Sequence, residues 1–171
     1  GIKQVLNQTV DFGASDAPMT EAELKQAKTP ISQIPTVLGG VVVTYNVKGL
    51  ENNLKLDGET IANIFLGKIS KWNDAAIQKL NPKSKLPATD ILVVRRSDGS
   101  GTTAIFTEFL GSVSAEFKTA VGVGKNVNWQ AGLGAKGNEG VTAMVAQTDG
   151  AVGYVELAYA LNNKLSTAAV K

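Results

Sequence analysis

Segments with the composition of β-strands alternate along this chain with segments whose apolar residues recur at helical spacing. The β-like segments are rich in apolar, often β-branched residues, and they are 10–14, 34–47, 91–94 and 151–155. After the third of them, helical spacing is carried by Ile105, Phe106, Phe109 and Leu110. Alternation of this kind is typical of α/β folds with largely parallel sheets. At 171 residues, 43% of them hydrophobic, the chain is long enough for one domain with a substantial core or for two small lobes.

Capping residues predict where several helices begin. A capping box formed by Thr20 and Glu23 starts one short helix, which ends before Pro30. The other candidate N-caps are Asp57, whose helix Gly67 closes, then Asn73 or Asp74, and finally Asn138. Gly39 and Gly40 interrupt the long β-like segment, which indicates a bulge, a bend or a crossover between lobes.

Composition excludes several classes of function. The chain contains neither Cys nor His, which excludes thiol nucleophiles, Ser-His-Asp triads and nearly all zinc or iron sites. Its net charge of +2 is too small to indicate nucleic-acid or membrane binding through bulk charge. No apolar run approaches the roughly 20 residues that span a bilayer. The N-terminus has neither an initiator Met nor the layout of a signal peptide, so the first residue looks like an internal cut.

The segment from Arg95 to Thr103 predicts a site for an oxyanion. A β-like run ends at two arginines, passes through small hydroxyl and glycine residues, and enters a helical stretch, which gives the order strand, loop, helix N-terminus. The N–H groups and the positive dipole end of a helix favour an anion, and an Arg guanidinium adds a planar fork of donors. A simpler interpretation, a surface turn that only starts a helix, fits the spacing equally well. The segment is not a Walker A loop, because no Lys follows Gly101.

Two carboxylates bear on this interpretation. Asp98 follows Arg96 by two residues and can hold the guanidinium in position, which lowers the cost of burying it. The alternative for this pair is an exposed ion pair of little energetic value. Asp16 lies in a turn before Pro18, where Asp most often hydrogen-bonds its own backbone. If Asp16 faces an oxyanion instead, it can only accept a hydrogen bond, so it selects a protonated anion such as phosphate over sulfate.

Two other patterns are weaker signals. The stretch from Gly132 to Gly137 matches the G-x-G-x-x-G pattern of dinucleotide-binding loops, with Glu156 near the position of a ribose-binding acid. The approach to it is short and polar, so a glycine-supported helix entry is the better interpretation. The pairs Asp57/Glu59 and Asp11/Asp16 could form a glycosidase couple, although helix capping explains the first pair more simply.

A set of ordered motifs, covering essentially the whole chain, resembles the periplasmic phosphate-binding proteins of bacterial phosphate-specific ABC transporters. The motifs that carry the resemblance are DFGASDAP (11–18), PTVLGGVV (35–42), LGKI (66–69), KW (71–72), RRSDGSGT (95–102), GLG (132–134), KGN (136–138) and VGYVE (152–156).

The resemblance implies a type II periplasmic-binding-protein fold, in which two α/β lobes joined by hinge strands close on one dehydrated phosphate. It implies a non-enzymatic receptor in the periplasm, or otherwise outside the cytoplasmic membrane, that delivers inorganic phosphate to the ABC permease of the inner membrane. No cofactor, metal or nucleic acid is implied. By position, Asp16 corresponds to the aspartate that accepts the phosphate proton and Arg96 to the arginine that pairs with the anion. Asp98 corresponds to the acid paired with that arginine, and the remaining hydroxyl and backbone donors correspond to Ser100, Gly101 and Thr102.

The chain is shorter than the family pattern at both ends. Family members begin with a segment carrying an Ala-Thr-Phe-Pro motif and a Gly-Ser-Ser-Gly-Gly loop, and they continue well past residue 171. We therefore expect a partial first lobe at 1–39, a complete second lobe at 40–150, and a hinge return with a further part of the first lobe at 151–171. A complementing segment from another chain could supply the missing part of the first lobe, and alone this chain is expected to bind phosphate weakly or not at all. The alternative function is a phosphatase-like enzyme that uses the same anion site, for which the sequence offers no metal cluster or activated nucleophile.

Overall fold

The computed structural model describes residues 1–15, 17–50 and 54–171, which divide into two compact units, Gly1–Leu38 and Gly39–Lys171. The first unit contains two short helices, α1 (Ile2–Leu6) and α2 (Glu21–Leu24). The Thr20 hydroxyl accepts the N–H of Glu23 at 3.2 Å, and the Glu23 carboxylate accepts the N–H of Thr20 at 2.8 Å. The predicted capping box is therefore confirmed.

The predicted strand at 10–14 is wrong. No strand is formed by the described residues of the first unit, and Val10 and Phe12 are exposed. A β-strand needs a neighbouring strand to satisfy its backbone N–H and C=O groups, and no such neighbour is found among the described residues of this unit.

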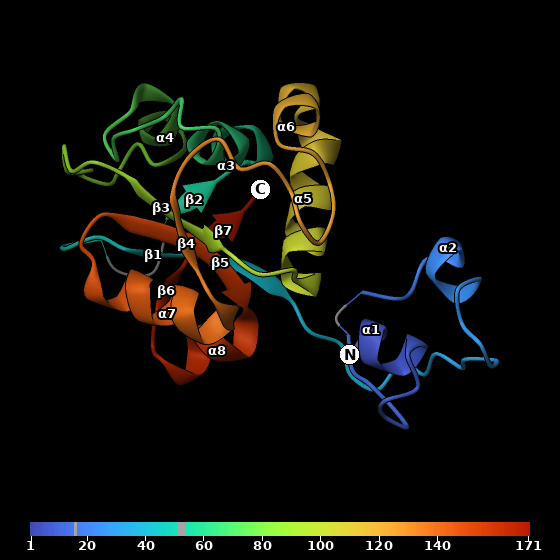
Figure 1. The fold of residues 1–171 in the computed structure, drawn as a ribbon. Helices are drawn as coiled ribbons and strands as arrows, with labels where there is room; N and C mark the ends of the chain where they lie inside the picture. The colour runs from blue at the N-terminus through green and yellow to red at the C-terminus, as the bar shows by residue number, and fades with distance from the viewer. Residues whose placement is uncertain (16, 51–53) are drawn as a thin grey trace. The chain divides into compact units, whose positions relative to one another are not determined.

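The second unit is a three-layer α/β structure around a five-stranded sheet (Figure 1). The strand order in this sheet is β4-β3-β5-β1-β6, while β2 and β7 pair in a separate two-stranded sheet. The strands are β1 (Val41–Asn46), β2 (Lys55–Leu56), β3 (Leu92–Arg96), β4 (Leu133–Ala135), β5 (Ala151–Glu156), β6 (Ser166–Thr167) and β7 (Ala169–Val170). The helices are α3 (Gly58–Phe65), α4 (Ala75–Leu80), α5 (Gly101–Val113), α6 (Ala115–Ala120), α7 (Gly137–Gln147) and α8 (Leu157–Asn162).

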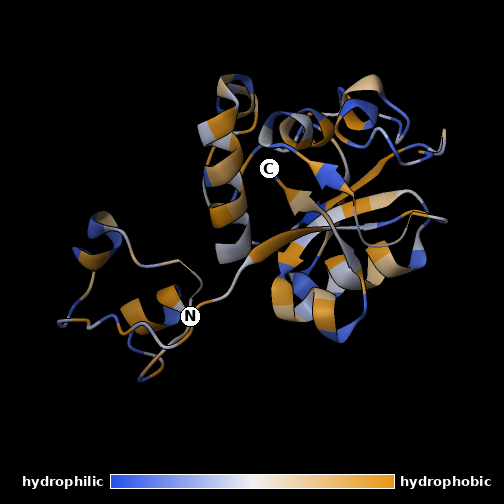
Figure 2. Cartoon of the chain, turned by 180° about the vertical axis from the view of Figure 1, so that it is seen from behind, coloured by the Kyte–Doolittle hydropathy of each residue, from blue (hydrophilic) through white to orange (hydrophobic). Residues whose placement is uncertain are grey.

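Helices α3 to α6 lie on one side of the sheet and helices α7 and α8 on the other (Figure 1). The strands supply a core to each side because successive side chains point to opposite faces. On β5, Val152 and Tyr154 join the cluster of α3, α4, α5 and α6, whereas Ala151 and Val155 join that of α7 and α8. Hydrophobic residues accordingly run along the strands of the sheet (Figure 2).

The predicted α/β class is confirmed, but the sheet is mixed rather than largely parallel. Strand β3 runs parallel to β4 and β5, while β1 runs antiparallel to β5 and β6. Strand β1 also covers only part of the predicted 34–47 segment. It spans the six residues that pair with β5, from Val41 opposite Glu156 to Asn46 opposite Ala151.

Local capping signals are largely confirmed. The carboxylate of Asp57 accepts the N–H of Thr60 at 2.9 Å at the start of α3, and Gly67 after that helix has a φ of +76°. Of the two candidates for α4, Asp74 is the cap. The hydrogen bond from Thr60 gives Asp57 a structural role, as the capping interpretation predicts. It also lowers the pKa of the Asp57 carboxyl.

The predicted cap at Asn138 is wrong. Helix α7 begins after Lys136 with no side-chain cap, and the chain enters it through Gly137 at a φ of +71°. The Oδ1 atom of Asn138 instead accepts the N–H of Glu156 at 3.2 Å. This hydrogen bond ties the first turn of α7 to the end of β5.

Residues 151–171 form β5, α8, β6 and β7, which all belong to the second unit. Strand β5 lies between β3 and β1 in the middle of the sheet. How this segment and 1–39 are shared between the lobes of a longer protein stays a prediction. Within the described ranges, no helix has the length and apolar character needed to cross a membrane.

Candidate functional site

The loop between β3 and α5 has the predicted order of strand, loop and helix N-terminus. Strand β3 ends at Arg96 and helix α5 begins at Gly101. Ser100 has extended backbone angles, and its hydroxyl oxygen accepts the N–H of Thr103 at 3.2 Å as the N-cap. The backbone N–H of Ser100 donates to the carbonyl of Lys125 at 3.0 Å, which anchors the loop to a neighbouring segment.

Arg96 and Asp98 form a two-pronged ion pair at the end of β3. The Nε atom of Arg96 donates to Oδ1 of Asp98 at 2.8 Å, and Nη2 donates to Oδ2 at 2.6 Å. The Arg96 side chain is only 9% exposed and that of Asp98 is 34% exposed. A guanidinium buried to this extent is costly without a partner. Asp98 therefore orients Arg96, and the alternative of an exposed surface pair does not fit.

Asp98 also connects this loop to helix α7. Its Oδ1 atom accepts the N–H of Gly137, the first residue of α7, at 3.1 Å. The hydrogen bonds from Arg96 hold the pKa of Asp98 far below its ordinary value, with a further contribution from the Gly137 N–H, although partial burial opposes the shift. Asp98 is ionised at neutral pH and receives donors from two separate elements.

The three predicted donor positions after Asp98 lie together at the start of α5. Ser100 and Thr102 are buried, with exposed fractions of 4% and 1%. The first N–H groups of any α-helix have no acceptor within the helix, and Gly101 and Thr102 occupy these positions in α5. The end of β3 thus brings an oriented guanidinium to a helix N-terminus, which is an arrangement suited to an oxyanion.

A second carboxylate lies in the electrostatic range of Arg96. Oε1 of Glu139, in the first turn of α7, accepts the hydroxyl of Tyr159 on α8 at 3.0 Å. The pKa of Glu139 is lowered, first by its own backbone N–H and then by the Tyr159 hydroxyl, with a smaller effect of the Arg96 charge. The same hydrogen bond raises the pKa of Tyr159. Because the Asp98 carboxylate already pairs with Arg96, the affinity of this loop for an anion must depend on hydrogen-bond donors as well as on charge.

Among the described residues, the other sequence patterns do not join this cluster. Asp16 lies outside the described residues. The G-x-G-x-x-G stretch does not form a turn between a strand and a helix, because residues 133–135 within it are strand β4 itself. Glycine at 137 does support the entry into α7, as the simpler interpretation predicts. No group of three or more His, Cys, Asp or Glu side chains that could hold a metal ion occurs in the part of the chain that the structure describes.

Two contacts of this site were not predicted from the sequence. One is the N–H of Gly137, which reaches Asp98 across 39 positions of the sequence. The other is the hydroxyl of Tyr154, which accepts the N–H of Arg96 at 3.2 Å and lies 2.8 Å from the hydroxyl of Thr103. Both residues fall within motifs of the family resemblance, but neither has a local pattern that indicates its partner.

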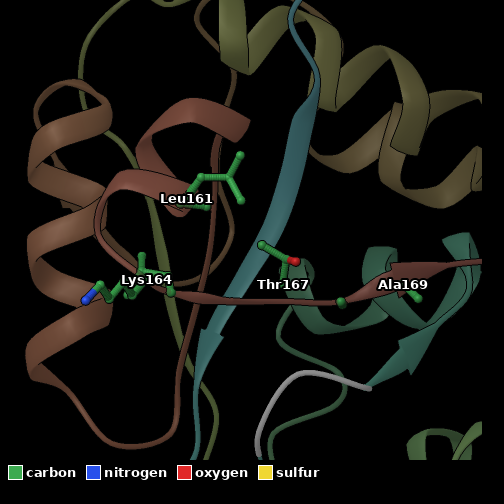
Figure 3. A pocket seen from close by; sticks show the side chains of 7 residues that line it. Leu161, Lys164, Thr167 and Ala169 are labelled. Atoms are coloured by element: carbon green, nitrogen blue, oxygen red, sulfur yellow. The ribbon is translucent and has the colours of Figure 1, made fainter.

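A separate pocket lies between α8 and strands β6 and β7. Leu161, Lys164, Thr167 and Ala169 are among the residues that line it (Figure 3). Its one charged side chain is that of Lys164, and the pocket contains none of the predicted site residues. We therefore assign the candidate anion site to the loop between β3 and α5 and not to this pocket.

The sequence is similar to those of known phosphate-binding proteins. A family model described as PBP superfamily domain matches residues 1–171. The chain is 53% identical over 172 residues to the phosphate-binding protein PstS of Xylella fastidiosa strain 9a5c. This alignment covers 100% of the chain and 47% of the Xylella protein. It is 51% identical to the protein of the same name from Pasteurella multocida, in an alignment that covers 100% of this chain and 49% of the Pasteurella protein. The chain thus spans about half the length of the curated relatives it matches.

Two solved structures share the fold. A high-affinity periplasmic phosphate-binding protein (PfluDING) bound with phosphate superposes with a TM-score of 0.76 at 22% identity, covering 99% of this chain and 52% of the other. A phosphate-binding protein from Stenotrophomonas maltophilia superposes with a TM-score of 0.68 at 23% identity, covering 100% and 55%. At this level of identity the superpositions confirm the α/β fold alone.

Proposed function

Because this chain belongs to the PBP superfamily, we propose that it forms part of a receptor that binds inorganic phosphate and delivers it to the permease of an ABC transporter. The observation that carries the proposal is the Arg96–Asp98 ion pair at the end of β3, a charged fork of donors held in place in the loop that leads into α5. The names of the relatives support phosphate as the anion. The receptor operates in the periplasm, or otherwise outside the cytoplasmic membrane, without a cofactor, a metal or nucleic acid.

In this proposal the loop supplies one wall of the phosphate site. Arg96 donates to the anion, Asp98 keeps the guanidinium in place, and Ser100, Gly101 and Thr102 donate through hydroxyl and backbone groups. Burial of Ser100, Thr102 and most of the Arg96 side chain supports this assignment, because donors shielded from water lose less to competition with solvent. The wall requires a facing wall, which the proposed first lobe provides.

Asp16 is proposed as the acceptor that reads the phosphate proton. An ionised carboxylate can only accept a hydrogen bond, so it attracts an anion that carries a proton and repels sulfate, which carries none near neutral pH. Sites that hydrogen-bond a required group can discriminate by roughly four to five powers of ten in the best cases. Replacing Asp16 with Asn should therefore reduce the preference for phosphate over sulfate. The test is a parallel titration, with phosphate and with sulfate, of a receptor that contains this chain and of its Asp16→Asn variant. An unchanged preference for phosphate would count against this role.

Segment 1–39 is proposed to belong to a first lobe that further residues complete. Segment 151–171, whose β5 lies within the sheet of the second unit, is proposed as the hinge return that leads to a further part of that lobe. Support comes from the first unit, where Phe12, Val37 and Leu38 are 87%, 84% and 99% exposed. Side chains of this kind are normally covered in a finished lobe. A segment in trans could supply the cover. Alone, the chain should bind phosphate weakly or not at all.

We propose a receptor rather than a phosphatase. The Ser100 hydroxyl oxygen is engaged as a helix cap, and the Asp98 carboxylate is engaged by Arg96 and Gly137, so neither is arranged as a nucleophile beside a general base. Release of product from a chromogenic phosphate ester, retained after metal stripping and lost in the Arg96→Ala variant, would revive the enzymatic alternative.

A chimeric receptor tests the proposed function. The matching 172-residue segment of the Xylella fastidiosa phosphate-binding protein is replaced by this chain, and phosphate binding is measured by calorimetry. We expect the chimera to bind phosphate and the Arg96→Ala variant to lose at least about a hundredfold in affinity, because charge-assisted hydrogen bonds to the anion disappear. Lys71→Ala, which removes an exposed ion pair with Asp90, serves as the control. A folded chimera that does not bind phosphate, or that binds equally well without Arg96, contradicts the proposal.

A further inference from the structure

The hydroxyl of Tyr154 is a buried junction between three elements of the second unit. Tyr154 lies on β5 and its side chain is fully buried. Its oxygen accepts the N–H of Arg96, the last residue of β3, at 3.2 Å. The same oxygen lies 2.8 Å from Oγ1 of Thr103 in the first turn of α5, and either hydroxyl can be the donor in that hydrogen bond.

This contact continues the connection of β3 to β5 where their backbone pairing stops. The ladder between the two strands runs from Leu92 opposite Ala151 to Val94 opposite Gly153. Arg96 follows two residues later, and its N–H is received by a side chain of β5 instead of a carbonyl of β5. A single hydroxyl thus joins the residue that carries the guanidinium to the helix turn that carries the other proposed donors.

Packing fixes the position of this hydroxyl. The ring of Tyr154 is stacked on Phe106 of α5, with centroids 4.3 Å apart and planes 12° from parallel. It is also stacked on Trp129 at 5.8 Å and lies 5.9 Å from Phe65 of α3. Burial raises the pKa of Tyr154, so the hydroxyl keeps its proton and can both donate and accept.

We infer that Tyr154 is a positioning residue of the phosphate site, whose hydroxyl sets the distance and orientation between Arg96 and the first turn of α5. This inference rests on the proposed function, because it concerns the same site. Tyr154 does not touch the anion in this account. It acts by holding two sets of donors in one arrangement, which lowers the reorganisation needed when phosphate binds.

Conservative variants separate this role from general stability. Tyr154→Phe removes the hydroxyl and keeps the ring in the core. Tyr45→Phe is the matched control, because Tyr45 is also almost fully buried and its hydroxyl accepts the N–H of Leu54 at 3.4 Å, away from the candidate site. Thr103→Val removes the partner hydroxyl and should act in the same direction as Tyr154→Phe, whereas Thr103→Ser, which keeps a hydroxyl, should act more weakly.

The first measurement is amide hydrogen exchange in the 171-residue chain without phosphate. We expect Tyr154→Phe to accelerate exchange of the Arg96 amide by about tenfold or more relative to the slowest core amides, since a buried hydrogen bond is lost. Tyr45→Phe should leave the ratio of the Arg96 exchange rate to the rates of the slowest core amides unchanged. If Tyr154→Phe also leaves this ratio unchanged, the positioning role is overturned.

The second measurement is phosphate affinity in the chimeric receptor described above. Tyr154→Phe should weaken binding by about tenfold, and Tyr45→Phe should leave it within about twofold. Equal affinity in a folded Tyr154→Phe chimera overturns the inference. If the unsubstituted chimera folds but does not bind phosphate, the proposed function itself is overturned, and the phosphate role of Tyr154 with it. That failure is distinguishable because it is seen before any substitution at Tyr154.

Discussion

Replacing Asp98 with Asn should destabilise the second unit by about 2 kcal/mol at neutral pH. Removing one partner of a buried ion pair typically costs about 3–5 kcal/mol. The Asp98 side chain is 34% exposed, and Asn retains an oxygen that can accept from Nε of Arg96 and from the Gly137 N–H. The loss is then the 2.6 Å hydrogen bond between Nη2 and Oδ2 together with the negative charge. A hydrogen bond to a charged group contributes about 1.5–3 kcal/mol, which sets the magnitude.

The effect should depend on pH in a defined direction. The pKa of Asp98 in the folded chain lies far below its ordinary value of 3.8, so the unfolded chain takes up a proton at Asp98 before the folded chain does. The contribution of the carboxylate is therefore complete above the unfolded pKa and declines as the pH falls below about 4. The stability difference between the original chain and Asp98→Asn should be constant from pH 7 to 5 and smaller at pH 3.

Urea unfolding followed by tryptophan fluorescence measures this difference, because Trp72 and Trp129 both lie in the second unit. Asp90→Asn is the matched control. It removes the carboxylate of an ion pair with Lys71 whose side chains are 83% and 54% exposed, and such pairs contribute about 0–1 kcal/mol. A cost for Asp98→Asn no larger than that for Asp90→Asn at pH 7, or a difference that grows at pH 3, would refute the reasoning.

Other changes should have equally specific effects. Ser100→Ala should cost about 1 kcal/mol in unfolding free energy through loss of the α5 cap, and Ser114→Ala, which removes the cap of α6, should cost a similar amount without changing phosphate affinity in the chimera. Gly153→Ala should lower the free energy of unfolding by about 1–3 kcal/mol, because the added Cβ would lie 2.9 Å from Val141 of α7. Gly40→Ala should change it by no more than about 0.5 kcal/mol, because nothing lies within 4 Å of the added atom. Equal losses in the two variants would contradict this prediction and show that α7 can shift. Calorimetry on the unmodified chain should detect weak phosphate binding or none, and affinity in the micromolar range or better would contradict the need for a facing wall.

Features fixed by residues close in sequence could be predicted. The capping box at Thr20, the cap at Asp57 and the Arg96–Asp98 pair all join groups two or three positions apart, where chain geometry leaves few alternatives. The strand at 151–155 was also predicted correctly, because both of its faces are buried and its sequence carries no charged residue before Glu156.

Features that depend on distant partners could not be predicted. Residues 10–14 have a strand-like composition, but the described part of the first unit supplies no strand to pair with them. Asn138 has the composition of a cap, yet its amide oxygen is engaged by Glu156. The contact between Tyr154 and Arg96 joins residues 58 positions apart, and nothing in the local sequence of either residue indicates it.

The most direct test of the central claim is an NMR titration of the ¹⁵N-labelled chimeric receptor with inorganic phosphate. If Arg96 and the start of α5 form a wall of the site, the backbone amide signals of Gly101 and Thr102 should shift together and saturate with the affinity found by calorimetry. Phosphate binding that leaves both signals in place would contradict the account.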